Sequence, residues 1–335
     1  MIVLGIETSC DDTSLALFSP DQGVIANFTA AQYVHEAYGG VVPELASRAH
    51  LKTLLPVFTG LLDRAGLDRK SITGIGVTNG PGLLGSLLVG AGFAKALALA
   101  LHLPIVGVHH IEAHIHANEL ELEELKLPCL VLVVSGGHTC LYRVDRPGGY
   151  SRLGTTRDDA AGEAFDKIAK LLGLGFPGGP ALEASAKTGD GRAVFFPRAM
   201  PGRYNFDFSF SGLKTAVRLY VEKNEPLDSR SRADIAASAQ AAIVDVLVEK
   251  TLSCARHQQI PHVYLAGGVA ANGLLRERLE SACREENRTC HAPLIRYCTD
   301  NGAMVACTAA KLLRLGLDEG QSLDVFARGT LESRA

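Results

Sequence analysis

The sequence predicts an α/β protein built from two related halves. Its 335 residues fit two domains or one large one, since domains commonly hold about 100–200 residues. Glycine is abundant, with 35 residues, and tryptophan is absent, which is typical of an α/β chain with many tight loops. A hairpin with a polar turn also occurs twice, at Ser9 and 126 residues later at Ser135. Two similar hairpins, each opening one half of the chain, predict a duplicated fold.

The composition limits the class of protein. Hydrophobic residues make up 47% and charged residues 21%, which predicts a globular chain rather than a disordered one. A net charge of −3 excludes a strongly basic nucleic-acid coat and a polybasic membrane binder. The first residues carry no basic segment and reach a carboxylate at Glu7, so no signal peptide is predicted. The eight cysteines show no C-x-x-C spacing, and we expect free thiols in a reducing cytoplasm.

The first half reads as strands alternating with helices. Apolar runs at 2–6 and 14–18 flank the polar turn of the first hairpin, and residues 44–65 have helical spacing. A strand at 72–78, a glycine-rich loop at 79–82 and an apolar helix at 83–101 form a βα unit, and another strand follows at 105–108. The helix is long enough to span a membrane, but it carries Lys95 and three glycines, so we expect a buried core helix.

The second half repeats this pattern. Residues 119–124 hold four glutamates and predict a solvated linker. The second hairpin has apolar runs at 130–134 and 140–144 around the turn at 135–139. A strand at 263–265 precedes a helix that begins near Asn272, and the last helix is expected at about 302–315.

A histidine cluster is the first candidate site. His109, His110, His114 and His116 lie within eight residues. On a helix, His110 and His114 share one face, and two imidazoles at this spacing can bind one metal ion. The alternative is a polar helix face or ordinary capping. The zinc-protease signature places Glu directly after the first histidine, whereas Glu112 stands two positions on, about 200° around the helix. A third ligand has to come from elsewhere, and Asp300 is a candidate by residue type.

Several turns could bind ligands. The turn at 135–139 exposes backbone N–H groups that can hold an anion, although it could equally be a plain hairpin turn. The carboxylates of Asp11 and Asp12 in the opening turn could position a cation or a nucleophile, or could simply be solvated. Glycine-rich loops at 79–82, 135–139, 176–180 and 267–268 together favour a nucleotide-type ligand between two lobes. Neither a P-loop nor a Rossmann fingerprint is present.

Residues 187–220 combine a net charge of +4 with seven of the twenty aromatic residues. Basic groups bind phosphates and aromatic rings stack on bases, so the segment is a candidate nucleic-acid contact. Alternatively, Tyr204, Phe206, Phe208 and Phe210 alternate as the inner face of a strand, and we expect core packing for most of these rings.

Nine motifs, in order along almost the whole chain, resemble one protein family. They are GIETSCD at 5–11, GGVVPE at 39–44, NGPGL at 79–83, HIEAH at 110–114, VSGGHT at 134–139, GEAFDK at 162–167, FSFSGLKT at 208–215, AGGV at 266–269 and CTDNG at 298–302. In them the chain resembles the universal Kae/Gcp/TsaD family of tRNA N6-adenosine threonylcarbamoyltransferases, in its bacterial form.

The resemblance implies a fold and an activity. The fold would be the actin-like, sugar-kinase-like (ASKHA) one, with two duplicated lobes and a central nucleotide cleft. Residues 1–118 plus 300–335 would form the first lobe, and 128–299 the second, with an inserted segment around 187–220. The enzyme would be an acyltransferase that moves threonylcarbamoyl from threonylcarbamoyl-AMP to N6 of adenosine 37 in tRNAs reading ANN codons, the t6A modification, and releases AMP. It would act in the cytoplasm, away from membranes, with a paralogous actin-like partner (TsaB) and a small ATPase (TsaE).

The resemblance also assigns site residues. One divalent metal ion, Fe²⁺ or alternatively Zn²⁺, would be held by His110, His114 and Asp300, and Asp11 would be the catalytic carboxylate. The substrate, an adenylate-type nucleotide, would contact a further set of residues: Val133, Val134, Ser135, Gly136, Gly137, Asp166, Gly179, Glu183 and Asn272. Two positions depart from the family pattern. Val133 replaces a metal-ligating tyrosine of archaeal relatives, and Asp12 replaces the glutamate of many bacterial ones.

Three other functions fit parts of this pattern. The paired histidines suggest a metalloprotease of the O-sialoglycoprotein endopeptidase type, and the fold suggests a sugar kinase or ATPase. A nucleotide-sensing scaffold without catalysis is the non-enzymatic alternative.

Overall fold

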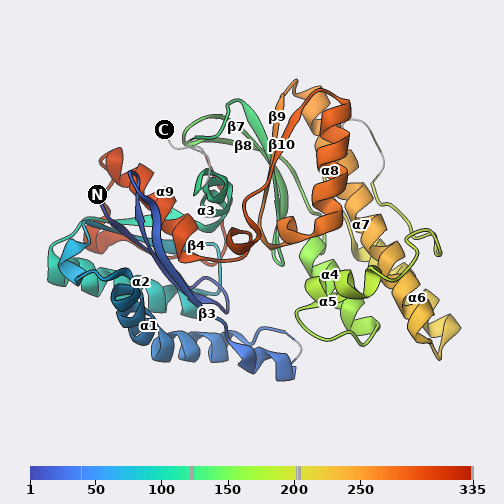
Figure 1. Cartoon of the computed structure of the whole chain (residues 1–335), viewed down its shortest axis with the longest axis horizontal. Helices are drawn as coiled ribbons and strands as arrows, with labels where there is room; N and C mark the ends of the chain where they lie inside the picture. Colours follow the sequence, from blue (N-terminus) through green and yellow to red (C-terminus); the bar gives the residue numbers. More distant parts are fainter. Residues whose placement is uncertain (39, 121–123, 201, 203–204, 333–335) are drawn as a thin grey trace. The chain divides into compact units, whose positions relative to one another are not determined.

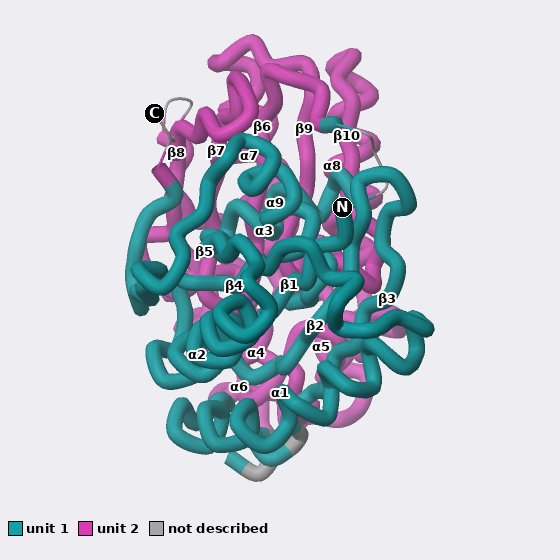
Figure 2. The backbone as a smooth tube through the Cα atoms, turned by 90° about the vertical axis from the view of Figure 1, so that its left-hand side faces the viewer, with its two compact units in different colours: residues 1–124, 299–331 teal, residues 125–298, 332–335 magenta. Residues whose placement is uncertain are grey.

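The structure is a computed structural model, and it describes all residues except 39, 121–123, 201, 203–204 and 333–335 (Figure 1). The chain divides into two compact units, which Figure 2 shows in different colours. Unit 1 contains Met1–Glu124 and Thr299–Leu331, and unit 2 contains Leu125–Cys298 and Glu332–Ala335. Each unit is built around one five-stranded sheet.

The two sheets share one topology. The first has the order β3-β2-β1-β4-β5 and the second β10-β9-β6-β7-β8, which is the same order read from the other end. In each, a central strand pairs antiparallel with the strand after it and parallel with a later strand. The strands are β1 (Val3–Glu7), β2 (Thr13–Ser19), β3 (Gly23–Ala30), β4 (Gly74–Gly80), β5 (Ile105–His109), β6 (Cys129–Val134), β7 (Thr139–Arg146), β8 (Gly149–Thr155), β9 (His262–Ala266) and β10 (Thr289–His291). Both predicted hairpins and the predicted duplication are confirmed.

Helices cover both faces of the first sheet. They are α1 (Pro43–Ala65), α2 (Leu84–Leu101), α3 (His110–His116) and α9 (Gly302–Arg314). Leu4 and Ile6 of β1 pack with the buried side chains of α1 and α2, whereas Val3 packs with those of α3 and α9. This alternation follows from the two-residue period of a strand. Position 7 of β1 therefore shares the face of Val3, toward α3 and α9.

The apolar helix α2 differs from its expectation. Only 33% of its residues are buried, and Leu84, Leu88 and Leu99 are exposed. By length and composition alone, α2 is the single helix among the described residues that could cross a membrane. One side, with Leu87, Ala91 and Ala94, is buried, so the expectation of a buried core helix is correct for that side only. In Figure 1, α1 and α2 run side by side, and they contact one another.

Within the described part of unit 2, five helices pack with the second sheet. They are α4 (Ala161–Leu171), α5 (Gly178–Ala186), α6 (Ser211–Asn224), α7 (Ser229–His257) and α8 (Gly273–Glu285). Their apolar faces and the alternate residues Leu130, Leu132 and Val134 of β6 form one core. Short 3-10 segments complete the described chain: Tyr33–Tyr38, Arg69–Ser71, Ala117–Leu120, Gly268–Ala271, Ile295–Tyr297 and Gly320–Ser322.

Two further expectations need correction. Glu119 in the predicted acidic linker is only 9% exposed, because it pairs with His116 and Lys311. Residues 121–123 of that linker lie outside the described residues. No strand forms at 206–210, where only Phe208 makes an isolated bridge, to Thr156. Phe208 and Phe210 are nevertheless buried as expected, while Tyr204 lies outside the described residues.

Candidate functional site

Helix α3 places two histidines on one buried face. β5 ends at His109, and α3 begins at His110. The side chain of His109 caps the helix by accepting a hydrogen bond from the Ile111 N–H at 3.2 Å. His110 and His114 are one turn apart, with ring centroids separated by 4.6 Å, and both are buried. Their arrangement follows directly from the i,i+4 spacing.

The start of α9 brings a carboxylate to these histidines. Asn301 caps α9 by accepting a hydrogen bond from the Met304 N–H at 2.9 Å, and the Gly302 N–H donates to Ser14 Oγ at 2.9 Å. A Cβ at position 302 would lie 2.5 Å from the backbone of Leu15, so only glycine permits this approach to β2. Asn301 and Gly302, which directly follow Asp300 in the chain, therefore fix the position of Asp300 beside α3.

Asp300, His110 and His114 converge on one point. Asp300 Oδ1 lies 3.1 Å from His114 Nε2 and 3.7 Å from His110 Nε2. One donor atom from each residue lies within 4.8 Å of the others. Two imidazole nitrogens and a carboxylate oxygen are a donor set that suits iron and zinc. Another observation fits a metal at this point, because the remaining nitrogen of His110, Nδ1, already faces the Glu7 carboxylate at 3.2 Å.

The electrostatics of this cluster favour a cation. Burial alone would lower the pKa of His110, but the carboxylates of Asp300 and Glu7 outweigh it and raise that pKa to about 9. Burial raises the pKa of Asp12 to about 7, with further contributions from Asp300 and Asp11. Several carboxylates thus repel one another in a confined volume, and a divalent cation relieves that repulsion.

The opening turn carries Asp11 and Asp12 beside this cluster, within unit 1. A buried histidine of α1 holds the turn. Nε2 of His50 lies 2.9 Å from the Cys10 carbonyl oxygen, and its Nδ1 lies 2.7 Å from Thr13 Oγ1. Burial lowers the pKa of His50, so the ring is neutral, donates from Nε2 and accepts from the Thr13 hydroxyl.

In unit 2, the Ser-Gly-Gly turn stands at the end of β6. The Ser135 N–H donates to the His138 carbonyl at 2.8 Å, so an anion here would meet the N–H groups of Gly136 and Gly137. The side chains of Val133 and Val134 are fully buried in β6, where they support the turn.

Backbone contacts hold this turn against its neighbours. At Gly267 φ is +88°, and a Cβ there would lie 2.4 Å from the Val134 carbonyl oxygen. The Gly162 N–H at the start of α4 donates to the Ser135 carbonyl at 3.2 Å.

The remaining predicted substrate residues either stand at a helix start, as Gly179 and Asn272 do, or accept a hydrogen bond from one, as Asp166 and Glu183 do. Asp166 accepts a hydrogen bond from the Gly178 N–H at 2.8 Å, beside Gly179 in the first turn of α5. Asn272 caps α8 by accepting from the Leu275 N–H at 3.0 Å. Glu183 of α5 accepts from the Gly273 N–H at 2.8 Å and so joins the start of α8 to α5. The helix starts expose N–H dipoles that favour anionic groups.

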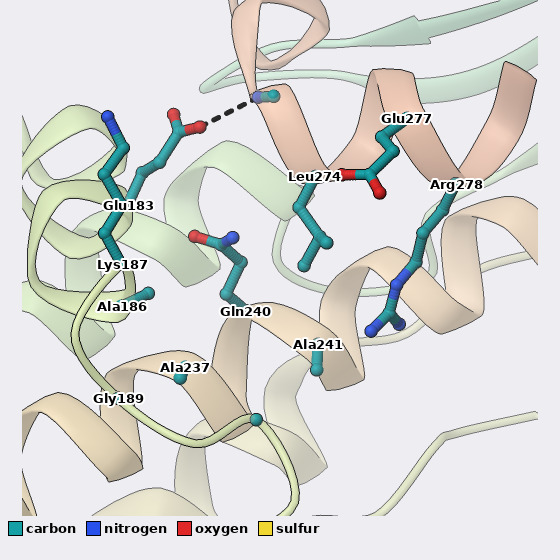
Figure 3. Close-up of a pocket in the computed structure, with 12 residues that line it drawn as sticks. Glu183, Ala186, Lys187, Gly189, Ala237, Gln240, Ala241, Leu274, Glu277 and Arg278 are labelled. Carbon is teal, nitrogen blue, oxygen red and sulfur yellow. Dashed lines mark hydrogen bonds between the residues drawn. The ribbon is translucent and has the colours of Figure 1, made fainter.

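A cavity of about 400 Å³ opens beside Glu183, between α5, α7 and α8 (Figure 3). Gln240 of α7 is 6% exposed, and its Oε1 has no hydrogen-bond partner in the described part of the chain. Figure 3 shows its amide pointing into the space between Glu183 and Leu274. Lys187 and Arg278 lie at the cavity lining as well. The cavity therefore offers both an acidic and an amide group to a ligand.

Much of the positive charge at 187–220 is compensated by acids outside that segment. Arg198 pairs with Asp245, which also binds Arg278, and Lys214 pairs with Asp159. Arg203 lies outside the described residues. Phe195 is 88% exposed, with the Arg198 guanidinium 5.5 Å from its ring centre, so one aromatic ring of the segment does face solvent.

Sequence reasoning singled out neither Glu7, His50 nor Gln240. Each is a polar side chain that the fold buries next to a candidate site. A polar residue inside an apolar strand, as at Glu7, is the one signal that the sequence carries for such a residue.

The family profile that matches this chain, over residues 23–307, is described as "TsaD: tRNA N6-adenosine threonylcarbamoyltransferase". A protein of that name from Syntrophus aciditrophicus is 48% identical over 334 residues, covering 99% of this chain and 98% of the relative. Another from Methylibium petroleiphilum is 49% identical over 322 residues, covering 94% and 92%.

Solved structures are similar in fold at low identity. HypF from T. kodakarensis gives a TM-score of 0.64 at 17% identity, covering 96% of this chain and 49% of that one. Component A of the Acidaminococcus fermentans (R)-2-hydroxyglutaryl-CoA dehydratase gives 0.56 at 14% identity, covering 93% and 98%. These likenesses confirm the predicted actin-like fold class.

Proposed function

The chain belongs to the family of tRNA N6-adenosine threonylcarbamoyltransferases, and we propose that it uses threonylcarbamoyl-AMP to modify N6 of adenosine 37 in tRNAs reading ANN codons. It is a transferase that acts on tRNA. In the reaction, the amine nitrogen bonds to the carbamoyl carbon, the bond from that carbon to the phosphate oxygen breaks, and AMP leaves. The tRNA supplies the nucleophile, so the protein contributes positioning and charge stabilisation.

The convergence of His110, His114 and Asp300 is the observation that carries the catalytic part of the proposal. These residues would hold one divalent ion, Fe²⁺ or alternatively Zn²⁺. When bound, the ion would polarise and orient the threonylcarbamoyl group. Asp11, in the opening turn of the same unit, would accept the proton that the attacking amine loses.

The substrate-binding part rests on unit 2. The N–H groups of Gly136 and Gly137 would hold phosphate or carboxylate oxygens, and the start of α5, with Asp166 and Gly179, would face the nucleotide. The cavity beside Glu183 would take the adenosine, with the Glu183 carboxylate toward the ribose hydroxyls. The amide of Gln240 can donate and accept at once, which suits the edge of adenine. Asn272 would fix the start of α8 at this cavity.

A partner surface is proposed on α1 and α2. Each helix has a pair of exposed leucines four residues apart: Leu51 and Leu55 on α1, and Leu84 and Leu88 on α2. Exposed apolar residues at this spacing form a face that another protein can cover. We assign it to a paralogous actin-like partner of the TsaB type, with a TsaE-type ATPase joining the assembly in the cytoplasm.

The peptidase alternative loses its general base. Glu112 is 1% exposed and stands two positions after His110, so it cannot activate a water at the paired histidines as in zinc proteases. The test is transfer of labelled threonylcarbamoyl from its adenylate to an ANN-decoding tRNA, with casein cleavage and sugar-dependent ATP turnover assayed in parallel. Label in the tRNA nucleoside supports the proposal, whereas cleavage or sugar-dependent turnover without labelled tRNA overturns it.

A further inference from the structure

Glu7 is a fully buried carboxylate that none of the assigned roles uses. It ends β1, on the face that β1 turns toward α3 and α9. Its side chain is 0% exposed. A buried carboxylate is costly unless its oxygens are hydrogen-bonded, so its partners show what it is for.

Three groups approach the two oxygens. The Ser9 N–H donates to Oε1 at 2.6 Å, and the Thr78 hydroxyl donates to Oε2 at 2.6 Å. Nδ1 of His110 lies 3.2 Å from the same Oε2. Donors from the opening turn and from β4 therefore fix the carboxylate. Oε2 can accept one more hydrogen bond, and it faces His110.

His110 is held between two carboxylates by its two nitrogens. Nδ1 lies 3.2 Å from both Glu7 Oε2 and Ser9 Oγ. Nε2 lies 3.7 Å from Asp300 Oδ1, on the side where the three candidate ligands converge. A neutral imidazole carries one N–H, and only the other nitrogen has a lone pair for a metal. A carboxylate can only accept, so it keeps the N–H at Nδ1, and Nε2 is then the nitrogen that gives up its proton to a metal.

We propose that Glu7 is a positioning residue, which fixes the ring orientation and the tautomer of His110 so that Nε2 is the metal-binding nitrogen. Metal-binding histidines commonly donate their second nitrogen to a carboxylate in this way. The inference rests on the metal site proposed above. It adds a residue at the end of β1 that prepares one ligand, His110, at the start of α3.

The test compares Glu7→Gln with wild type by titrating the metal-free protein with Zn²⁺ in a calorimeter. Glutamine keeps the size of the side chain, but its amide nitrogen cannot replace an oxygen facing Ser9 N–H, Thr78 Oγ1 and His110 Nδ1 without losing an acceptor. We expect the Kd for Zn²⁺ to rise about 10–100-fold. Glu112→Gln is the matched control, since Glu112 is equally buried in α3 but stands two positions from His110. It should keep the wild-type Kd.

The possible outcomes distinguish failure of the proposed role of Glu7 from failure of the proposed metal site. If wild type binds no Zn²⁺, the metal site itself is wrong. If wild type binds and folded Glu7→Gln binds with the same Kd, the role of Glu7 is wrong.

A second measurement needs no Glu7 variant, in case that variant fails to fold. Long-range ¹H–¹⁵N correlation on the zinc-loaded wild type, with His110→Gln to assign the signal, reports which nitrogen of His110 keeps its proton. Protonated Nδ1 supports the inference, and protonated Nε2 overturns it.

Discussion

Nε2 of His114 lies 3.1 Å from Oδ1 of Asp300, although the two residues stand 186 positions apart in the chain. The contact exists because α9 begins directly on β2, where a side chain at position 302 would collide with Leu15. A helix from the C-terminal end of the sequence thus completes a site that α3 begins.

The first prediction concerns this contact. His114→Ala and Asp300→Asn each remove one of three ligands, so we expect loss of bound metal and a fall in transfer rate of at least about 100-fold. Metal content after dialysis, measured by mass spectrometry, and single-turnover transfer check it. The control is His102→Asn, at an exposed histidine of the same unit with φ of 55° that asparagine also adopts. Full metal content in both ligand variants would contradict the prediction.

Asp11 and Asp12 offer a matched pair in the opening turn. If Asp11 accepts the proton of the attacking amine, Asp11→Asn should lower the transfer rate about 10²–10⁴-fold with KM for tRNA unchanged. Asp12→Asn removes the neighbouring carboxylate and should leave the rate within about tenfold, because the proposal gives it no proton-transfer role. Equal losses in the two variants would show that the turn needs its total charge, not one base.

The buried ring of His50 predicts a dependence of stability on pH. The pKa of His50 is lower in the folded chain than in the unfolded chain. At a pH between the two values, the unfolded chain therefore binds a proton at His50 and the folded chain does not. The stability that His50 contributes is therefore present above the ordinary histidine pKa and is lost as the pH falls through about 6.5 toward 5. Glutamine can still donate to the Cys10 carbonyl but does not titrate. Thermal melting at pH 7 and pH 5 should show a smaller drop in Tm for His50→Gln than for wild type, and an equal drop would refute this explanation.

The cavity beside Glu183 makes a binding prediction. Replacing the amide of Gln240 by an apolar group of similar size, in Gln240→Leu, should weaken AMP binding about tenfold, since one hydrogen bond to a base contributes on the order of 1.4 kcal/mol. Calorimetric titration of AMP measures it. Glu277→Gln, at an exposed position on the rim of the same cavity, is the control. Unchanged affinity in Gln240→Leu would place the adenine elsewhere.

The exposed leucines of α1 and α2 predict a protein interface. A charge at Leu55 or Leu88 should abolish co-elution with the TsaB-type partner in size-exclusion chromatography, because desolvating a carboxylate in an apolar interface is costly. Leu315→Glu, at a leucine 73% exposed just after α9, should leave co-elution intact. Co-elution of Leu55→Glu and Leu88→Glu with the partner would locate the interface on another surface.

Local sequence patterns predicted the helices and strands of this chain well, but they predicted contacts between distant residues poorly. The spacing of His110 and His114 was enough to predict one shared helix face, because that geometry depends on four residues only. Asp300 could be proposed by residue type and resemblance, but its distance from His114 depends on how α9 packs on β2.

The predictions that were wrong also depended on contacts between segments that lie far apart in the sequence. Phe206, Phe208 and Phe210 alternate like a strand, yet no neighbouring strand pairs with them beyond one bridge at Phe208 among the described residues. Helix α2 is apolar on all sides, but only one side of it packs against the rest of the chain, so its other side is exposed. Glu119 lies in an acidic run and is buried because Lys311 reaches it from α9.

Removing the metal and returning it shows whether transfer depends on an ion held by His110, His114 and Asp300. Protein purified with its partners is stripped with a chelator, and transfer of labelled threonylcarbamoyl from its adenylate to an ANN-decoding tRNA is followed in a single turnover. We expect transfer to stop in the stripped protein and to return on addition of one equivalent of Fe²⁺ per chain, but not in Asp300→Asn. Undiminished transfer by the metal-free protein would contradict it.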